Sequence, residues 1–118
     1  MDEAPQLQLA EIVQVTYGSL TCMVRCVAGT VRLGETVELR SATIDLSIAA
    51  GLTVAVIEYY DGIFMDFVDL GRTALVTVTG PIDVSALRAL APKKSPEHLR
   101  EADLRLVVSA SQPRRSAS

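Results

Sequence analysis

The sequence predicts an all-β fold, a small closed six-stranded β-barrel. Short segments alternate apolar and polar residues, as half-buried strands do. Glycine-containing turns separate these segments at short intervals. At 118 residues and 49% hydrophobic content, the chain is long enough for one domain with its own core. A barrel is favoured over an open sheet because closure removes exposed strand edges.

The first half of the chain predicts four strands, over residues 7–17, 20–28, 36–40 and 43–48. Gly29 and Gly34 bracket a turn region between the second strand and the third. In the first strand Glu11 interrupts the apolar row. The side chains expected to face inward there are Leu7, Leu9, Val13 and Val15. Residues 49–51, Ala-Ala-Gly, are expected to form a turn.

The second half predicts a strand over residues 52–60, which are dense in β-branched and aromatic residues. Residues 61–71 form a loop or a turn of helix that is apolar enough to close one end of a barrel. A strand over 73–79 ends at Gly80 and Pro81. Residues 83–90 then predict a short helix with Asp83 at its cap.

We expect the barrel to occupy residues 1–92, followed by a short basic C-terminal helix and a flexible tail over residues 93–118. Ser95, Pro96 and Glu97 are the residue types that open a helix. Residues 104–108 fit the end of that helix weakly and also fit a strand. The sequence from Ser109 onward predicts a disordered tail.

Charge is distributed unevenly along the chain. Residues 1–92 hold five basic and eleven acidic side chains, whereas residues 93–118 hold six basic and three acidic ones, for a net charge of −3. An acidic body argues against a large surface that follows nucleic-acid phosphates. No apolar run approaches the roughly 18 residues of a membrane-spanning helix, and residues 1–5 lack the features of a signal peptide. We therefore expect a cytoplasmic protein without membrane contact.

The sequence shows no set of catalytic or metal-binding residues. Cys22 and Cys26 are four positions apart on one strand, about 13 Å by strand rise, too far for a disulfide or a shared metal. His98 is the single histidine and has no evident catalytic partners. The densest acidic cluster lacks the spacing of a calcium loop and consists of Asp61, Asp66 and Asp69. We expect no enzyme activity, no cofactor and no metal.

Residues 25–39, R-C-V-A-G-T-V-R-L-G-E-T-V-E-L, resemble a family signature almost position by position. This signature, a strand followed by x-G-x-(I/V)-(K/R)-x-G-(D/E)-x-(V/L)-x-(I/L), is that of domain 2 of the translational GTPases, the barrel beside the G domain in elongation factor Tu. Residues 11–15 with Gly18, and residues 69–80, resemble two further strands, so the resemblance covers about residues 9–82. Val24 departs from the usual glycine, and Arg72 from the usual acidic residue.

The resemblance implies a translation-factor type of barrel, which packs on a G domain and contacts ribosomal RNA and protein. In elongation factor Tu it also forms part of the pocket for the aminoacylated tRNA end. A family glutamate that holds the terminal adenosine has its nearest equivalent at Glu58; the alternative is an ordinary carboxylate at a strand end. Tyr59 or Tyr60 is placed to stack on a base, but adjacent residues face opposite sides of a strand. The chain contains no G-x-x-x-x-G-K-(S/T), so we expect no GTP binding or hydrolysis.

The apolar segment over residues 63–68 has two interpretations. It is either core that closes the barrel end, or an exposed ridge that docks on a protein. Met23 and Arg25, on the outer side of the second strand, would extend such a ridge. We expect a non-catalytic binding module for a protein partner, with RNA (a tRNA end) or the ribosome as the alternative. The candidate binding residues are Phe64, Phe67, Glu58 and Tyr60.

Overall fold

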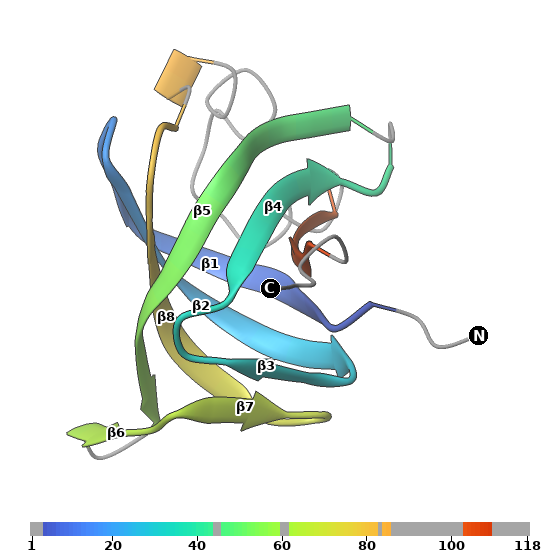
Figure 1. Cartoon of the computed structure of the whole chain (residues 1–118), viewed down its shortest axis with the longest axis vertical. Helices are drawn as coiled ribbons and strands as arrows, with labels where there is room; N and C mark the ends of the chain where they lie inside the picture. Colours follow the sequence, from blue (N-terminus) through green and yellow to red (C-terminus); the bar gives the residue numbers. More distant parts are fainter. Residues whose placement is uncertain (1–3, 44–45, 60–61, 83, 86–102, 110–118) are drawn as a thin grey trace, which may run out of the picture.

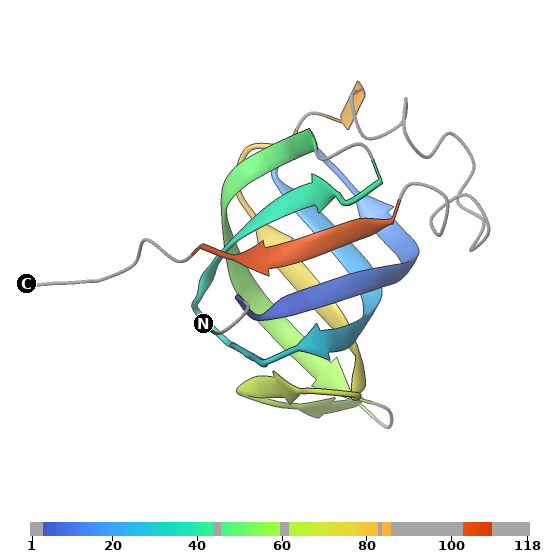
Figure 2. The ribbon, with the colours of Figure 1, turned by 90° about the vertical axis from the view of Figure 1, so that its right-hand side faces the viewer.

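Six antiparallel strands close into a barrel in the computed structural model, which describes residues 4–43, 46–59, 62–82, 84–85 and 103–109 (Figures 1 and 2). The ring runs in the order β4-β9-β1-β2-β8-β5, and a β4–β5 pairing closes it. The strands are β1 (Gln6–Val15), β2 (Ser19–Ala28), β4 (Thr36–Ser41), β5 (Leu46–Tyr59), β8 (Thr73–Thr79) and β9 (Leu104–Val108). The predicted all-β barrel is confirmed.

The core is aliphatic and follows the alternation of the strands. On β2 every second residue from Leu20 to Ala28 is buried, as predicted. Ser41 is the one polar side chain in the buried set of the described residues. The largest side chains with almost no exposure are Leu7, Leu20, Leu39, Leu52, Ile57, Leu104 and Leu106. Each ring strand contributes buried side chains to this interior, so the core fills the barrel from all sides.

Strand β1 contains bulges that change which residues face inward. Leu9 pairs with Val24 but Glu11 pairs with the next residue, Met23, so Ala10 is an extra residue on β1. The phase of the strand shifts there, and Ile12 becomes buried. A further irregularity follows Ile12, and Val13 is 48% exposed. The prediction that Val13 faces inward was therefore wrong, and the interruption of the apolar row at Glu11 marks the first bulge.

Strand β5 runs without a break through the residues expected to form a turn. Val37 of β4 pairs with Leu52, and Leu39 pairs with Ala49, so one extra residue of β5 lies between these pairs. Gly51 has a φ of +72° at this bulge, a conformation that glycine adopts without steric strain. The predicted turn was wrong because the glycine bends the strand instead of ending it (Figure 1).

Strand β9 corrects the prediction of a C-terminal helix for residues 104–108. It pairs with β1 on one edge and with β4 on the other, and Leu104, Leu106 and Val108 are buried. A segment expected to lie outside the barrel thus contains one of its strands. Residues 95–102 of the predicted helix, residues 86–90 of the shorter one, and the tail from residue 110 lie outside the described residues.

Asp103 holds the start of β9 against β1. Its carboxylate accepts hydrogen bonds from Gln8 Nε2 at 3.0 Å and Arg105 Nε at 3.1 Å. Its backbone oxygen accepts a bond from the Ala42 N–H at 2.9 Å. Asp103 has a φ of +47°, in the left-handed region that Asp tolerates better than most residues. These contacts fix the turn from which the strand enters the barrel wall.

Three short strands lie at one end of the barrel (Figures 1 and 2). β3 (Thr30–Arg32) and β7 (Phe67–Asp69) pair with each other, and their central residues, Val31 and Val68, are fully buried. β6 (Ile63–Phe64) pairs with the end of β5, and both of its side chains are exposed. Residues 63–68 therefore divide between the two interpretations, core at Val68 and exposed surface at Phe64. No helix in the described ranges is long and apolar enough to cross a membrane.

Candidate binding surface

One row of side chains crosses the outer face of four neighbouring strands. Met23 on β2 lies opposite Leu75 on β8, and Leu75 lies opposite Glu58 on β5. Glu58 in turn lies opposite Phe64 on β6. The sequence neighbours of Met23 and Leu75 are all buried, so the row faces away from the core. We call Met23, Leu75, Glu58 and Phe64 the outer row.

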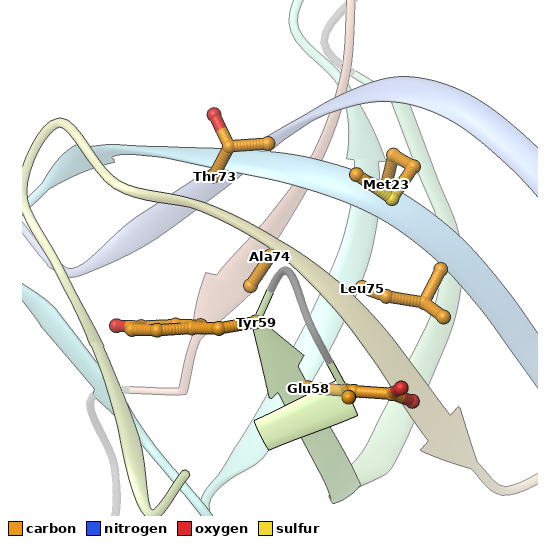
Figure 3. A pocket seen from close by; sticks show the side chains of 7 residues that line it. Met23, Glu58, Tyr59, Thr73, Ala74 and Leu75 are labelled. Carbon is orange, nitrogen blue, oxygen red and sulfur yellow. The ribbon is translucent and has the colours of Figure 1, made fainter. Parts of the chain in front are cut away.

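A hollow of about 210 Å³ opens beside this row (Figure 3). The β5–β8 ladder ends at the pair Glu58–Leu75, whereas β6 pairs along the other edge of β5. The hollow lies at this end of the β5–β8 ladder. The described residues that line it are Met23, Glu58, Tyr59, Gly62, Thr73, Ala74 and Leu75. Among these described residues Glu58 is the one that carries a charge, and its carboxylate lies beside largely apolar walls.

Tyr59 is held in place as one wall of the hollow. Its hydroxyl donates a hydrogen bond to the backbone oxygen of Phe67 at 3.1 Å. The guanidinium of Arg72 lies 5.5 Å from the ring centroid, within range of a cation–π interaction. The ring is half-buried and packs against the core. Because its hydroxyl and one face of its ring both have partners, the Tyr59 side chain forms a rigid aromatic wall of the hollow.

Glu58 is half-buried and has no hydrogen bond or ion pair within the part of the chain that the structure describes. Figure 3 shows its side chain extending in the same direction as that of Leu75. A Cβ added to Gly62 would lie 3.7 Å from Glu58 Oε2, so the glycine keeps the space next to the carboxylate free. The carboxylate is available to an external group.

A second hollow, of about 190 Å³, is lined by Phe64 and by residues of β5. Phe64 is 70% exposed, and Ile63 and Leu33 are exposed as well. The lining residues are Leu33, Ala55, Val56, Ile57, Phe64, Met65 and Asp66. Phe64 lines this second hollow, and its cross-strand partner Glu58 lines the first. The exposed apolar side chains of Phe64 and Leu33 thus share one hollow at this end of the barrel.

Of the four candidate binding residues predicted from the sequence, Glu58 and Phe64 lie side by side in the outer row. Phe67 is half-buried in β7 opposite Arg32, and Tyr60 lies outside the described residues. Leu75 was missed, although the alternation of residues 73–79 already assigns it to the outer face.

The other candidate chemical groups form no second site within the part of the chain that the structure describes. Cys22 and Cys26 are buried free thiols, and burial raises the pKa of Cys22 to about 12. Burial also raises the pKa of Cys26, whose Sγ lies 3.2 Å from the backbone oxygen of Gly29. Among the described residues no three His, Cys, Asp or Glu side chains are grouped to hold a metal. His98 and Asp61 lie outside those residues.

Neither a protein-family model nor a curated protein matched the chain. The closed barrel is compatible with the resemblance to a translation-factor domain, but membership of that family has no support from relatives.

Proposed function

We propose that this chain is a non-catalytic module that docks on a protein partner through the barrel end around Phe64. The observation that carries the proposal is the position of Phe64, which is 70% exposed on a two-residue strand, lines one apolar hollow and lies opposite Glu58 of another. Aromatic residues at the centre of an apolar surface are typical energetic anchors of protein interfaces. Full burial of such a ring by a partner contributes on the order of 2 kcal/mol.

The charge of the surface favours a protein over nucleic acid. The outer row contains a carboxylate, and Asp66 and Asp69 are exposed on the adjoining segment. The chain is acidic overall, with a net charge of −3. Nucleic-acid binding is driven largely by Lys and Arg that neutralise phosphates. Binding of an RNA end or the ribosome is therefore the outcome that would displace this proposal.

We extend the proposal to the type of barrel, a translation-factor domain 2 that acts in the cytoplasm. The segment that carries the resemblance supports this extension. Gly29 and Gly34 both have positive φ, +65° and +90°, and flank β3 as the spaced glycines of the signature require. A GTPase or a ribosomal component encoded separately is then the kind of partner to expect.

The test compares capture of partners by the tagged full chain and by two matched variants. Phe64→Ala removes the proposed anchor, whereas Tyr17→Ala removes an aromatic residue that is 73% exposed near the β1–β2 turn. We expect wild type and Tyr17→Ala to retain the same discrete protein at high salt and after ribonuclease treatment. Phe64→Ala should reduce its capture tenfold or more.

Two results would contradict the proposal. Equal capture by Phe64→Ala and wild type would show that the barrel end is not the docking surface. Loss of all captured material on ribonuclease treatment, with steep dependence on salt, would replace the protein partner with RNA. In that case Glu58 would be the first residue to test.

A further inference from the structure

We propose that the hollow beside Glu58 receives one arginine side chain of the partner. This inference rests on the proposed docking function and names the chemistry that the docking surface recognises. Its basis is the combination of a small hollow, apolar walls and a carboxylate that has no ion pair or hydrogen bond among the described residues. Phe64 lines the second hollow, not this one, so the two features can be tested separately.

The size of the hollow points to a single side chain. Its volume is about 210 Å³, whereas sites for cofactors and other small molecules typically measure about 300–1,000 Å³. The Tyr59 ring is fixed at its hydroxyl by the Phe67 backbone, so this wall does not retreat to enlarge the space. A side chain that projects from a docked segment fits these dimensions.

The lining selects a side chain with an apolar stem and a cationic head. Met23 and Leu75 form apolar walls, and Glu58 supplies the charge on the same outer row. Long basic side chains bury their methylene groups along apolar surface and keep the charge at a polar group. Arginine suits a half-buried carboxylate better than lysine, because its guanidinium is more weakly hydrated and pairs with two oxygens at once.

The chain's own nearby arginines do not neutralise Glu58. Arg72 lies over the Tyr59 ring, and Arg25 lies on β2 opposite Thr73, outside the row of Glu58. Neither forms an ion pair with Glu58 in the described structure. A half-buried carboxylate without a partner gains from an external cation, since hydrogen bonds to charged groups contribute more than neutral ones. Charge complementarity thus identifies the occupant.

The experiment is a titration of the ¹⁵N-labelled full chain with N-acetyl-arginine methylamide, followed by NMR. The amide signals of Glu58, Tyr59, Gly62 and Leu75 should shift together and saturate, with a dissociation constant in the millimolar range. The citrulline analogue has the same shape without the charge and should not saturate. The lysine analogue should bind more weakly than the arginine analogue.

Variants test whether Glu58 is the group that binds the arginine analogue. Glu58→Gln should weaken binding of the arginine analogue about tenfold, as expected when a charged hydrogen bond is lost. Glu11→Gln removes the same charge from an exposed position on β1 and should leave binding unchanged. The inference is overturned if the arginine analogue shifts none of these signals, or if Glu58→Gln binds as wild type does. It is also overturned if citrulline or lysine binds equally well.

The outcome is separable from that of the docking proposal. In Phe64→Ala the arginine analogue should still bind, because Phe64 does not line this hollow. If the analogue fails to bind but Phe64→Ala still loses the partner, the arginine inference falls and the docking surface stands. If the analogue binds and Phe64→Ala keeps the partner, the docking proposal falls instead.

Discussion

Strands β9 and β6 are both short and rich in large apolar residues, yet β9 buries such side chains and β6 exposes them. β9 pairs on both edges, with β1 and β4, and buries Leu104 and Leu106 completely. β6 ends the sheet order with β5 as its neighbour, and Ile63 and Phe64 are 54% and 70% exposed. Apolar composition therefore does not decide burial. Pairing on both edges makes β9 part of the barrel wall, with alternate side chains in the core, whereas the edge strand β6 leaves both of its side chains exposed.

The sharpest test of this contrast is Leu106→Ala in β9. Leu106 is fully buried, so the substitution should lower the free energy of unfolding by about 2–5 kcal/mol, through lost transfer energy and a residual cavity. Equilibrium urea unfolding measures the loss. Val107→Ala, on the outward side of the same strand, is the control and should change stability by less than about 1 kcal/mol. Equal effects at the two positions would mean that β9 does not occupy the barrel wall.

A second, smaller loss of stability is expected from a substitution at the bulge of β5. Gly51 has a φ of +72° and open space around it, so Gly51→Ala introduces backbone strain without a clash. We expect it to destabilise the fold by about 1–2 kcal/mol. Gly51→Asn should lose less, because Asn tolerates the left-handed region. Wild-type stability of Gly51→Ala in urea would contradict the bulge and restore the turn that the sequence predicted.

The strands that could be predicted from the sequence are those whose alternation is unbroken. β2 and β8 match their predicted ranges because buried and outward side chains alternate along their whole length. β1 and β5 contain bulges, and an extra residue inverts the inward phase after it, which explains Val13. The segment over residues 104–108 fits either a helix or a strand locally. Its conformation is decided by β1 and β4, which lie far away in the sequence.

The candidate site could be predicted only in part for the same reason. Glu58 and Phe64 were singled out, one from the family resemblance and the other from the apolar ridge. Their position in one row with Met23 and Leu75 depends on the register of four strands. The β5–β8 register contains an irregularity between Val54 and Val56, and no local pattern announces it. Which residues are neighbours on an outer face is therefore a property of the closed barrel.

The Asp103 carboxylate at the start of β9 is expected to make a smaller contribution to the stability of the fold. Burial raises its pKa, but the hydrogen bonds from Arg105 and Gln8 and the Arg105 charge outweigh burial and hold the pKa below its usual value of 3.8. A lowered pKa in the folded state stabilises the fold above the unfolded-state pKa. That stabilisation is lost as the pH falls through the folded-state value. Since both partners are partly exposed, its size is below about 1 kcal/mol.

The substitution Asp103→Asn measures this contribution, because Asn also tolerates the left-handed backbone conformation at this position. The stability difference from wild type, in urea unfolding, should be constant from pH 7 to about pH 5 and vanish in stronger acid. Asp66→Asn, which removes a carboxylate from the exposed loop, is the control for the loss of one negative charge. A difference that persists at pH 2 would mean that the Asp103 carboxylate is not the stabilising group.

The smallest change in stability is expected at Phe64, where the effect on partner capture should be largest. The ring is 70% exposed, and its cross-strand neighbour is a carboxylate. Phe64→Ala should therefore change the free energy of unfolding by no more than about 0.5 kcal/mol in urea. Met65→Ala is the comparison, because Met65 packs against the core and should destabilise more. A loss of 2 kcal/mol or more in Phe64→Ala would place its ring in the second hollow in solution. The aromatic residue would then stabilise the barrel end as core residues do, and its edge strand would resemble β9 after all.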